Sequence, residues 1–317
     1  MEKTLKNKSK PDINKCTLIF QNYAKEWQLV FMFLPVVLCL GIFCYAPMYG
    51  IVIAFKDYRI IDGIMGSPWV GLKHFQSLFT APSFRQVFGN TIKISFLRML
   101  FGFPAPIILS LLLNEIKNVH YKKIVQTVSY LPHFLSWVIL SGIFINFLSP
   151  TTGFVNQVIS YYGGKPIYFV ADIDYFVPML IVTGIWKGVG WGTIIYLAAI
   201  SNINPELYEA AIVDGANRFK RIIHITLPGI APVVSVMFIL NSSNLINAGF
   251  DQIFNFYNEA VYRVSDIIDT YVYRRGIQQA QYSFSTAVGL FKNIISFSLV
   301  LTTNLIVKRV NKEGGIW

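Results

Sequence analysis

The sequence predicts an all-α integral membrane protein with about six transmembrane helices. Of its 317 residues, 54% are hydrophobic and only 14% are charged, and the mean hydropathy is +0.51. These values are unfavourable for a protein whose whole surface meets water. A bilayer core about 30 Å thick is crossed by about 20 apolar residues in a helix. Six segments meet that requirement: 29–55, 91–113, 125–148, 176–200, 227–250 and 284–307.

Basic residues gather at the ends of these apolar runs. The formal net charge of +11 raises the question of nucleic acid binding. However, the sequence has no continuous basic face with interleaved aromatic residues, so we expect membrane lipid and not nucleic acid as the partner of these charges. The positive-inside rule then gives the orientation, because one set of connecting segments holds nearly twice as many Lys and Arg residues as the other, in fewer residues. The richer set, expected in the cytoplasm, comprises 1–28, 114–124, 201–226 and 308–317, and the poorer set comprises 56–90, 149–175 and 251–283.

The chain therefore divides into three parts with both termini in the cytoplasm. They are a cytoplasmic segment 1–28, a six-helix transmembrane domain 29–307 with a cytoplasmic loop at 201–226, and a cytoplasmic tail 308–317. We expect a multi-pass protein of a bacterial plasma membrane.

Spans two, four and six each carry basic residues, whereas spans one, three and five carry no charged residue. A Lys or Arg at the bilayer centre costs about 2.5–3.5 kcal/mol, so it faces the bundle interior or extends to the interface. Lys93 and Arg98 lie towards the outer end of span two, and we expect both to extend to the interface. For Lys187 and Lys292, a position along a transport pathway and extension to the interface are both open.

The loop 201–226 is unusually ordered for a connection between two spans. Asn204 is a good N-cap, Pro205 suits the first turn of a helix, and the Asp214-Gly215 pair favours a bend. After the bend, apolar residues recur at helical spacing, with basic residues on the other faces. This pattern predicts an amphipathic helix at the membrane surface, formed by Phe219, Ile222, Ile223 and Leu227, with Pro228 at the start of the next span.

Small residues in the same loop leave room for another protein to approach closely. They are Ala210, Ala211, Gly215 and Ala216. The competing interpretation is an ordinary amphipathic helix at the interface, without a protein partner.

The order of residues in "EAAIVDGANRFKRIIHITLP" (209 to 228) resembles the cytoplasmic loop motif of the membrane subunits of binding-protein-dependent ABC importers. Glu-Ala-Ala is followed after three residues by Gly, and after nine more by Ile-x-Leu-Pro, so seven positions match without a gap. The stretch "GWGTIIYLAAISNINPELYEAAIVDGA" (190 to 216), which leads into this motif, resembles the carbohydrate-uptake branch, of the maltose-permease type. The C-terminal "KRVNKEGGIW" (308 to 317) resembles tails of permeases for complex oligosaccharides and polysaccharide fragments.

The resemblance implies the fold of a type I ABC importer permease and a coupling helix that docks on a separate ATPase. The residues expected to couple to the ATPase are Glu209, Ala210, Ala211, Asp214, Gly215 and Ala216. Among them, Glu209 would make the polar contact, the alanines would permit close packing and Gly215 would form the bend. Leu227 and Pro228 would position the loop against the span.

The partners implied by the resemblance are a second, similar permease, two copies of a cytoplasmic ATPase, an external solute-binding protein and a carbohydrate substrate. No Gly-rich phosphate loop of the form GxxxxGK[ST] occurs in the sequence, so we expect this chain to bind no cofactor, with ATP and Mg²⁺ on the partner ATPase. The chain itself would catalyse no reaction.

Sugar recognition uses aromatic platforms and hydrogen-bonding amides. Trp186, Trp191, Asn241, Asn244 and Asn247 offer both inside the predicted bundle. Together with Lys187, they are candidates for a substrate pathway. For "NSSNLIN" (241 to 247), hydrogen bonding between helices is the alternative to substrate contact.

Other functions have less support from the sequence. The four His residues, at 74, 120, 133 and 224, are scattered, and no paired carboxylates fall within a span, so no enzyme site is visible. A partner-independent secondary transporter usually has acidic coupling residues at the midplane, and only basic ones occur here. An ABC importer for an amino acid or another small solute is the nearer alternative, because the loop motif is shared with such importers.

Overall fold

The computed structural model describes residues 27–310, in two compact units divided between Val52 and Ile53. The expected cytoplasmic segments 1–28 and 308–317 lie almost wholly outside the described residues. Their orientation therefore stays a prediction.

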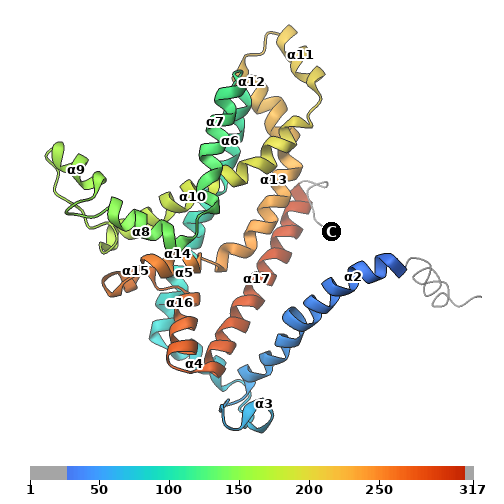
Figure 1. The fold of residues 1–317 in the computed structure, drawn as a ribbon. Helices are drawn as coiled ribbons and strands as arrows, with labels where there is room; N and C mark the ends of the chain where they lie inside the picture. The colour runs from blue at the N-terminus through green and yellow to red at the C-terminus, as the bar shows by residue number, and fades with distance from the viewer. Residues whose placement is uncertain (1–26, 311–317) are drawn as a thin grey trace, which may run out of the picture. The chain divides into compact units, whose positions relative to one another are not determined.

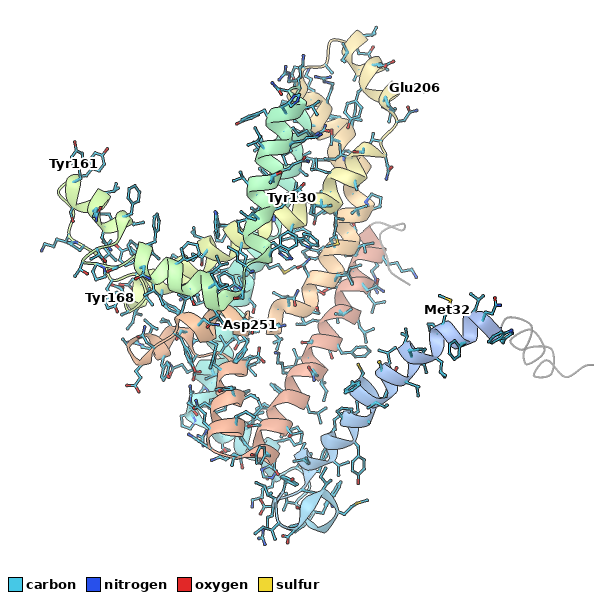
Figure 2. The ribbon with its side chains drawn as sticks, in the orientation of Figure 1. Met32, Tyr130, Tyr161, Tyr168, Glu206 and Asp251 are labelled. Atoms are coloured by element: carbon cyan, nitrogen blue, oxygen red, sulfur yellow. The ribbon has the colours of Figure 1, made fainter. Side chains whose placement is uncertain are left out.

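The first unit carries the first predicted span as helix throughout its described part. It consists of α2 (Trp27–Cys39), the π-helix η1 (Leu40–Tyr45) and the start of the 3₁₀-helix η2 (Ala46–Phe55). Its apolar side chains point outward, and Met32, labelled in Figure 2, is 75% exposed. A helix that is apolar all round and exposed suits a lipid environment.

The second unit is also helical, and residues 53–310 contain no strand beyond an isolated bridge between Lys56 and Trp69. Its elements (Figure 1) are, in chain order, α3 (Gly63–Gly66), α4 (Lys73–Thr80), α5 (Pro82–Gly102), α6 (Pro104–Glu115), α7 (Val119–Tyr130), η3 (Leu131–Phe134), α8 (Trp137–Phe147), α9 (Phe154–Tyr161), α10 (Ile173–Ser201), α11 (Pro205–Val213), α12 (Arg218–Arg221), η4 (Ile222–Thr226), α13 (Leu227–Ser242), η5 (Ser243–Ile246), α14 (Phe250–Phe256), η6 (Glu259–Val261), α15 (Tyr262–Ser265), α16 (Ile268–Tyr273), η7 (Arg274–Gln278) and α17 (Tyr282–Val310).

Within residues 27–310, five helices are long and apolar enough to cross a membrane, or six if one bent pair counts as a span, as the sequence predicts. They are Trp27–Phe55, Pro82–Glu115, Ile173–Ser201, Arg218–Ile246 and Tyr282–Arg309, and the bent pair is Val119–Phe134 with Trp137–Phe147. The second span starts at Pro82, nine residues before the predicted start. Proline suits the first turn of a helix, and the helix continues through the polar residues that the apolar pattern left out.

The prediction of one continuous helix over 125–148 is wrong. The two halves of this span meet at 107°. Leu135 has extended backbone angles, and the hydroxyl of Ser136 caps the new helix by accepting a hydrogen bond from the amide of Ile139 (3.3 Å). A capping serine after a short 3₁₀ turn starts a second helix in a new direction.

The prediction of a separate amphipathic helix at the membrane surface after Gly215 is also wrong. The helix that begins at Arg218 continues without interruption into the fifth span. Pro228 lies inside this continuous helix because the preceding turn, η4, is a π-helix, whose wider turn accommodates the missing amide. At the other end the span stops at Ile246 and not at 250.

The long helix α10 lies at the centre of the second unit. It packs against α5, α6, α7 and α13, and its Phe176 and Leu180 side chains are fully buried. A side chain on Gly190 would overlap the backbone of Ser129 in α7, and one on Gly192 would lie 2.9 Å from Pro106 in α6. Small residues therefore let three helices approach closely, as they do between membrane helices in general. Beside this bundle, α13 and α17 lie side by side (Figure 1).

Candidate functional site

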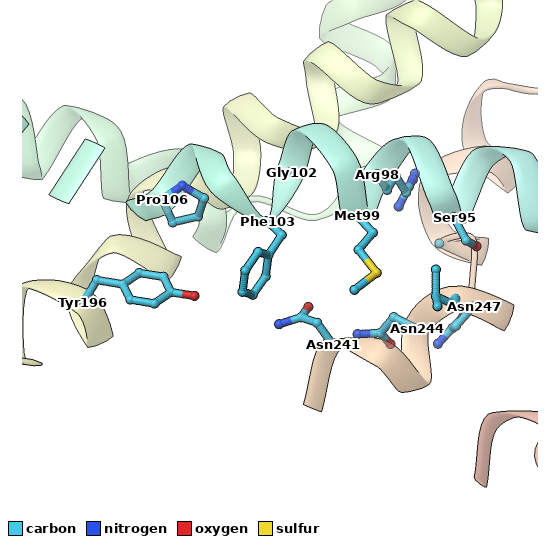
Figure 3. Close-up of a pocket in the computed structure, with 12 residues that line it drawn as sticks. Ser95, Arg98, Met99, Gly102, Phe103, Pro106, Tyr196, Asn241, Asn244 and Asn247 are labelled. Atoms are coloured by element: carbon cyan, nitrogen blue, oxygen red, sulfur yellow. The ribbon is translucent and has the colours of Figure 1, made fainter. Parts of the chain in front are cut away.

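A cavity of about 380 Å³ lies between α5, α10 and the end of the fifth span. Figure 3 shows Met99 of α5 and Phe103, which lies between α5 and α6, on one wall and the three asparagines Asn241, Asn244 and Asn247 opposite them. The predicted pathway asparagines thus share one cavity. The structure favours a role facing this space over hydrogen bonding between helices. Of the three side-chain amides, only that of Asn241 has a hydrogen-bond partner among the described residues, and this partner is the Met237 carbonyl of its own helix (2.9 Å).

The backbone unwinds where these asparagines lie. The α-helix gives way to η5 after Ser242, and Gly249 then adopts a left-handed conformation with φ of 84°. Glycine accepts this conformation without steric cost. The polar run "NSSNLIN" thus forms the end of a helix that borders a cavity, where irregular backbone is tolerated inside a membrane.

Arg98 joins three helices at the cavity wall, which contradicts the expectation that it extends to the interface. Its guanidinium donates a hydrogen bond to Oε1 of Gln252 in α14. The Gln252 amide in turn donates to the Leu180 carbonyl (2.9 Å) and the Thr183 hydroxyl (2.8 Å) of α10. The guanidinium lies against Gly249, where any side chain would overlap it. Lys93, by contrast, is exposed, and its extension to the interface stays a prediction.

A second cavity of about 330 Å³ adjoins the first and shares Arg98, Gly102 and Pro106 with it. Lys187 lines this second cavity, at the bend of the third span. Its ammonium donates to the carbonyls of His133 (3.0 Å) and Leu135. The bend deprives these carbonyls of helical partners, and an unsatisfied carbonyl inside a membrane costs free energy. Lys187 therefore lines this cavity and stabilises the bend, and its ammonium is held inside the bundle instead of extending to the end of its helix. Its role in a transport pathway stays a prediction.

The two candidate tryptophans already have aromatic partners. Trp191 stacks on His133 with ring centroids 4.6 Å apart, and Trp186 meets Phe144 edge to face at 5.4 Å. Neither lines the two cavities, although both remain nearly half exposed. The aromatic surfaces of the first cavity come instead from Phe103 and Tyr196, which sequence reasoning missed.

Two other half-buried cations of the second unit are paired with acids. Lys292 lies 2.5 Å from Asp269, and Arg274 lies 2.5 Å from Asp266. Lys292 also lines a third, open cavity. Burial opposes the charge of Arg274, but the hydrogen bond and the attraction of Asp266 outweigh it and raise the pKa of the guanidinium.

The loop after α10 begins as the sequence predicts. The Asn204 side chain accepts a hydrogen bond from the Glu206 amide (3.0 Å), and Pro205 occupies the first turn of α11. The helix ends in a Schellman motif, with hydrogen bonds from the Ala216 amide to the Ala211 carbonyl (2.8 Å) and from the Gly215 amide to the Ile212 carbonyl (3.0 Å). Gly215 has φ of 74°, so the predicted bend at this glycine is confirmed.

The predicted coupling residues form an accessible surface on α11 and its end. Glu209, Ala210, Asp214 and Gly215 are exposed, and Ala211 and Ala216 are half-buried. Glu209 has no ion pair among the described residues, so its carboxylate is available to a partner. Leu227 and Pro228 are exposed on the helix that follows.

Other residues hold this loop to the spans. The Tyr208 and Thr226 hydroxyls lie 3.0 Å apart, Arg218 lies 3.8 Å from Glu115 of α6, and Gly229 leaves no room for a side chain beside Ile203. The Tyr208–Thr226 contact connects α11 to the fifth span, and the Arg218–Glu115 contact connects the fifth span to the second.

Comparisons with known proteins agree on one type of protein. Residues 102–313 match the model of the family described as "Binding-protein-dependent transport system inner membrane component". The chain is 45% identical to Protein LplB of Bacillus subtilis (strain 168) over 91% of each protein. It is 44% identical to the polygalacturonan/rhamnogalacturonan transport system permease protein YteP of the same organism, over 94% of this chain and 91% of YteP. It also resembles a chain of a bacterial ABC transporter involved in the import of the acidic polysaccharide alginate, with a TM-score of 0.86 and 41% identity over 92% of this chain and 99% of that one.

Proposed function

The chain belongs to the family of binding-protein-dependent transport system inner membrane components, and we propose that it forms one half of the membrane pathway of an ATP-driven carbohydrate importer. Its fold is that of a type I ABC importer permease, and it is a multi-pass protein of the bacterial inner membrane. The partner-independent secondary transporter considered above does not agree with this family.

The observation that carries the carbohydrate assignment is the cavity lined by Asn241, Asn244, Asn247 and two aromatic side chains. Amides exchange hydrogen bonds with sugar hydroxyls, and aromatic rings contact the apolar faces of sugar rings. The names of YteP and of the alginate transporter, both concerned with polysaccharides, support a substrate of the same class. An oligosaccharide fragment fits these relatives better than an amino acid.

The energy would come from a separate ATPase that docks on α11. Glu209 would make the polar contact, Ala210, Ala211 and Ala216 would permit close approach, and Asp214 and Gly215 would form the end of the docking helix. Leu227 and Pro228 would position the following span. Closure of the ATPases on ATP and Mg²⁺ would move α11, and its links through Tyr208 and Arg218 would shift the bundle between two arrangements.

The complete importer would contain a second homologous permease, two copies of the ATPase and a solute-binding protein outside the membrane. Dependence on a binding protein is a property of the family. The chain described here would hold no nucleotide itself.

The test is a tagged purification from native membranes in mild detergent, with mass spectrometry of the co-purified proteins and their ratio. We expect a second permease and an ATPase at about 1:1:2. The double variant Glu209→Ala/Gly215→Val should lose the ATPase and keep the second permease, because its changes lie on the docking helix. Glu206→Ala, on the first turn of the same helix, is the matched control and should retain both. Recovery of the chain alone, under conditions that preserve a known ABC complex, would contradict the proposal.

A further inference from the structure

The two cations of the adjoining cavities, Arg98 and Lys187, lack a carboxylate partner among the described residues, unlike Lys292 and Arg274. Asp269 and Asp266 neutralise Lys292 and Arg274. Arg98 and Lys187 have no acidic partner within residues 27–310, and no Asp or Glu lines either of their cavities. The combined cavity is therefore a positively charged space inside an apolar bundle.

Arg98 is held in place and still has donors to spare. Gln252 fixes one terminal nitrogen, and Gly249 removes any side chain from the surface against which the guanidinium lies. The Nε atom is buried and has no hydrogen-bond partner among the described residues. A guanidinium has five N–H donors in a planar fork that matches a carboxylate. The Arg98 guanidinium is thus held in one position while some of its N–H donors remain without a hydrogen-bond partner.

A structural role accounts for the position of Lys187 without any contact to a substrate, because its ammonium donates hydrogen bonds to the two carbonyls at the bend. Its charge nevertheless adds to the potential of the second cavity, and its ammonium lies 5.4 Å from the centre of the Trp137 ring. A buried cation without a counter-charge is unfavourable in a bilayer and marks a functional site when it faces a cavity. The missing negative charge must then come from what enters the cavity.

We propose that the substrate is an acidic oligosaccharide, whose sugar carboxylates are bound by Arg98 while the asparagine amides bind its hydroxyl groups. This inference rests on the proposed carbohydrate import and names the substrate class. Arg98 contacts the carboxylate directly, and Lys187 acts through the positive potential that it adds. Neutral oligosaccharides leave Arg98 without a counter-charge and are transported less efficiently.

The test uses the complete importer, purified with its co-isolated partners and reconstituted in vesicles with its binding protein. Uptake is measured for a trisaccharide of galacturonic acid and for its carboxyl-reduced form, which differs only in having CH₂OH in place of each carboxylate. The variants are Arg98→Gln, Arg98→Lys and Lys93→Gln, the last being a control at an exposed position of the same helix. Recovery of the assembled complex serves as the folding control for each variant.

We expect Arg98→Gln to lower uptake of the acidic trisaccharide about 10- to 100-fold, the range for loss of a hydrogen bond to a charged group. Uptake of the neutral trisaccharide should change much less. Arg98→Lys should restore most of the acidic uptake because it keeps the charge, and Lys93→Gln should behave as the unmodified importer.

An equal loss for both sugars, or Arg98→Lys no better than Arg98→Gln, would overturn the inference and leave carbohydrate import intact, because Arg98 would then only hold the helices together. If the unmodified importer takes up only the neutral trisaccharide, the inference of an acidic substrate is likewise overturned and carbohydrate import is retained. If the unmodified importer takes up neither of these sugars nor any of a panel of other acidic and neutral oligosaccharides, the proposed function itself is wrong.

Discussion

Replacing Gly190 with alanine should destabilise the helix bundle, whereas the same change at Gly188 should not. A Cβ on Gly190 would lie 2.9 Å from the Ser129 Cβ and closer still to the Ser129 carbonyl. The Ser129 carbonyl oxygen is the limiting contact, because it would lie 2.1 Å from this Cβ and real Cβ contacts are essentially never shorter than 3.0 Å, so α7 would have to move by about 1 Å. Overpacking of this kind costs about 1–3 kcal/mol. A Cβ on Gly188 meets nothing within 4 Å in the described structure.

The two substitutions form a matched pair on one helix. Both gain about 1 kcal/mol from the better helix propensity of alanine, so the difference between them isolates the strain. At about 2–4 °C per kcal/mol, Gly190→Ala should lose its folded, monodisperse form at a temperature roughly 2–10 °C below that of Gly188→Ala. Fluorescence-detected size exclusion of heated, detergent-solubilised protein measures this temperature. Two variants that unfold within 1 °C of each other would refute the close approach of α7 and α10.

Three further predictions concern residues outside this contact. Gly215→Asn should keep most of the substrate-stimulated ATPase activity of the assembled importer, and Gly215→Val should lose it. Asparagine tolerates the left-handed conformation of Gly215, whereas a β-branched residue does not. Asp266→Ala should destabilise the chain by about 1–3 kcal/mol because it leaves the half-buried Arg274 without its charged partner. Asp62→Ala, at an exposed ion pair, should destabilise it by less than about 1 kcal/mol; thermal unfolding compares the two variants. Burial raises the pKa of the Tyr257 hydroxyl, so the folded state keeps the tyrosine proton above pH about 10, where the unfolded chain loses it. The stability of the folded state therefore falls as the pH rises through the folded-state pKa. Tyr257→Phe should remove this part of the pH dependence, as measured by unfolding at alkaline pH.

The length of the apolar segments predicted the spans well, because the thickness of the hydrocarbon core sets how many apolar residues a membrane-spanning helix needs. It did not find the ends of the helices, since Arg218 continues the fifth span through polar residues that length alone excludes. The bend of the third span had a local signal in Pro132 and the capping Ser136, which a count of apolar residues ignores.

The geometry of the loop that carries the expected coupling residues could be predicted because it is local. An N-cap at Asn204 and a left-handed glycine at Gly215 depend on neighbours within a few residues. The cavity could be predicted only in part. The asparagines stand out in an apolar run, but Arg98 and Gln252 are 154 residues apart and meet only because α5 and α14 both pack against α10.

The contacts of Lys187 also impose an order on biogenesis. The carbonyls of His133 and Leu135 leave the ribosome 54 and 52 residues before the lysine that satisfies them. At about 5–20 residues per second, this interval is about 3–10 s. During that time the third apolar stretch must enter the membrane as a straight helix or keep water at its bend. The bent conformation is completed only when the fourth span arrives, so insertion of this protein is cooperative between two segments that are separate in the chain.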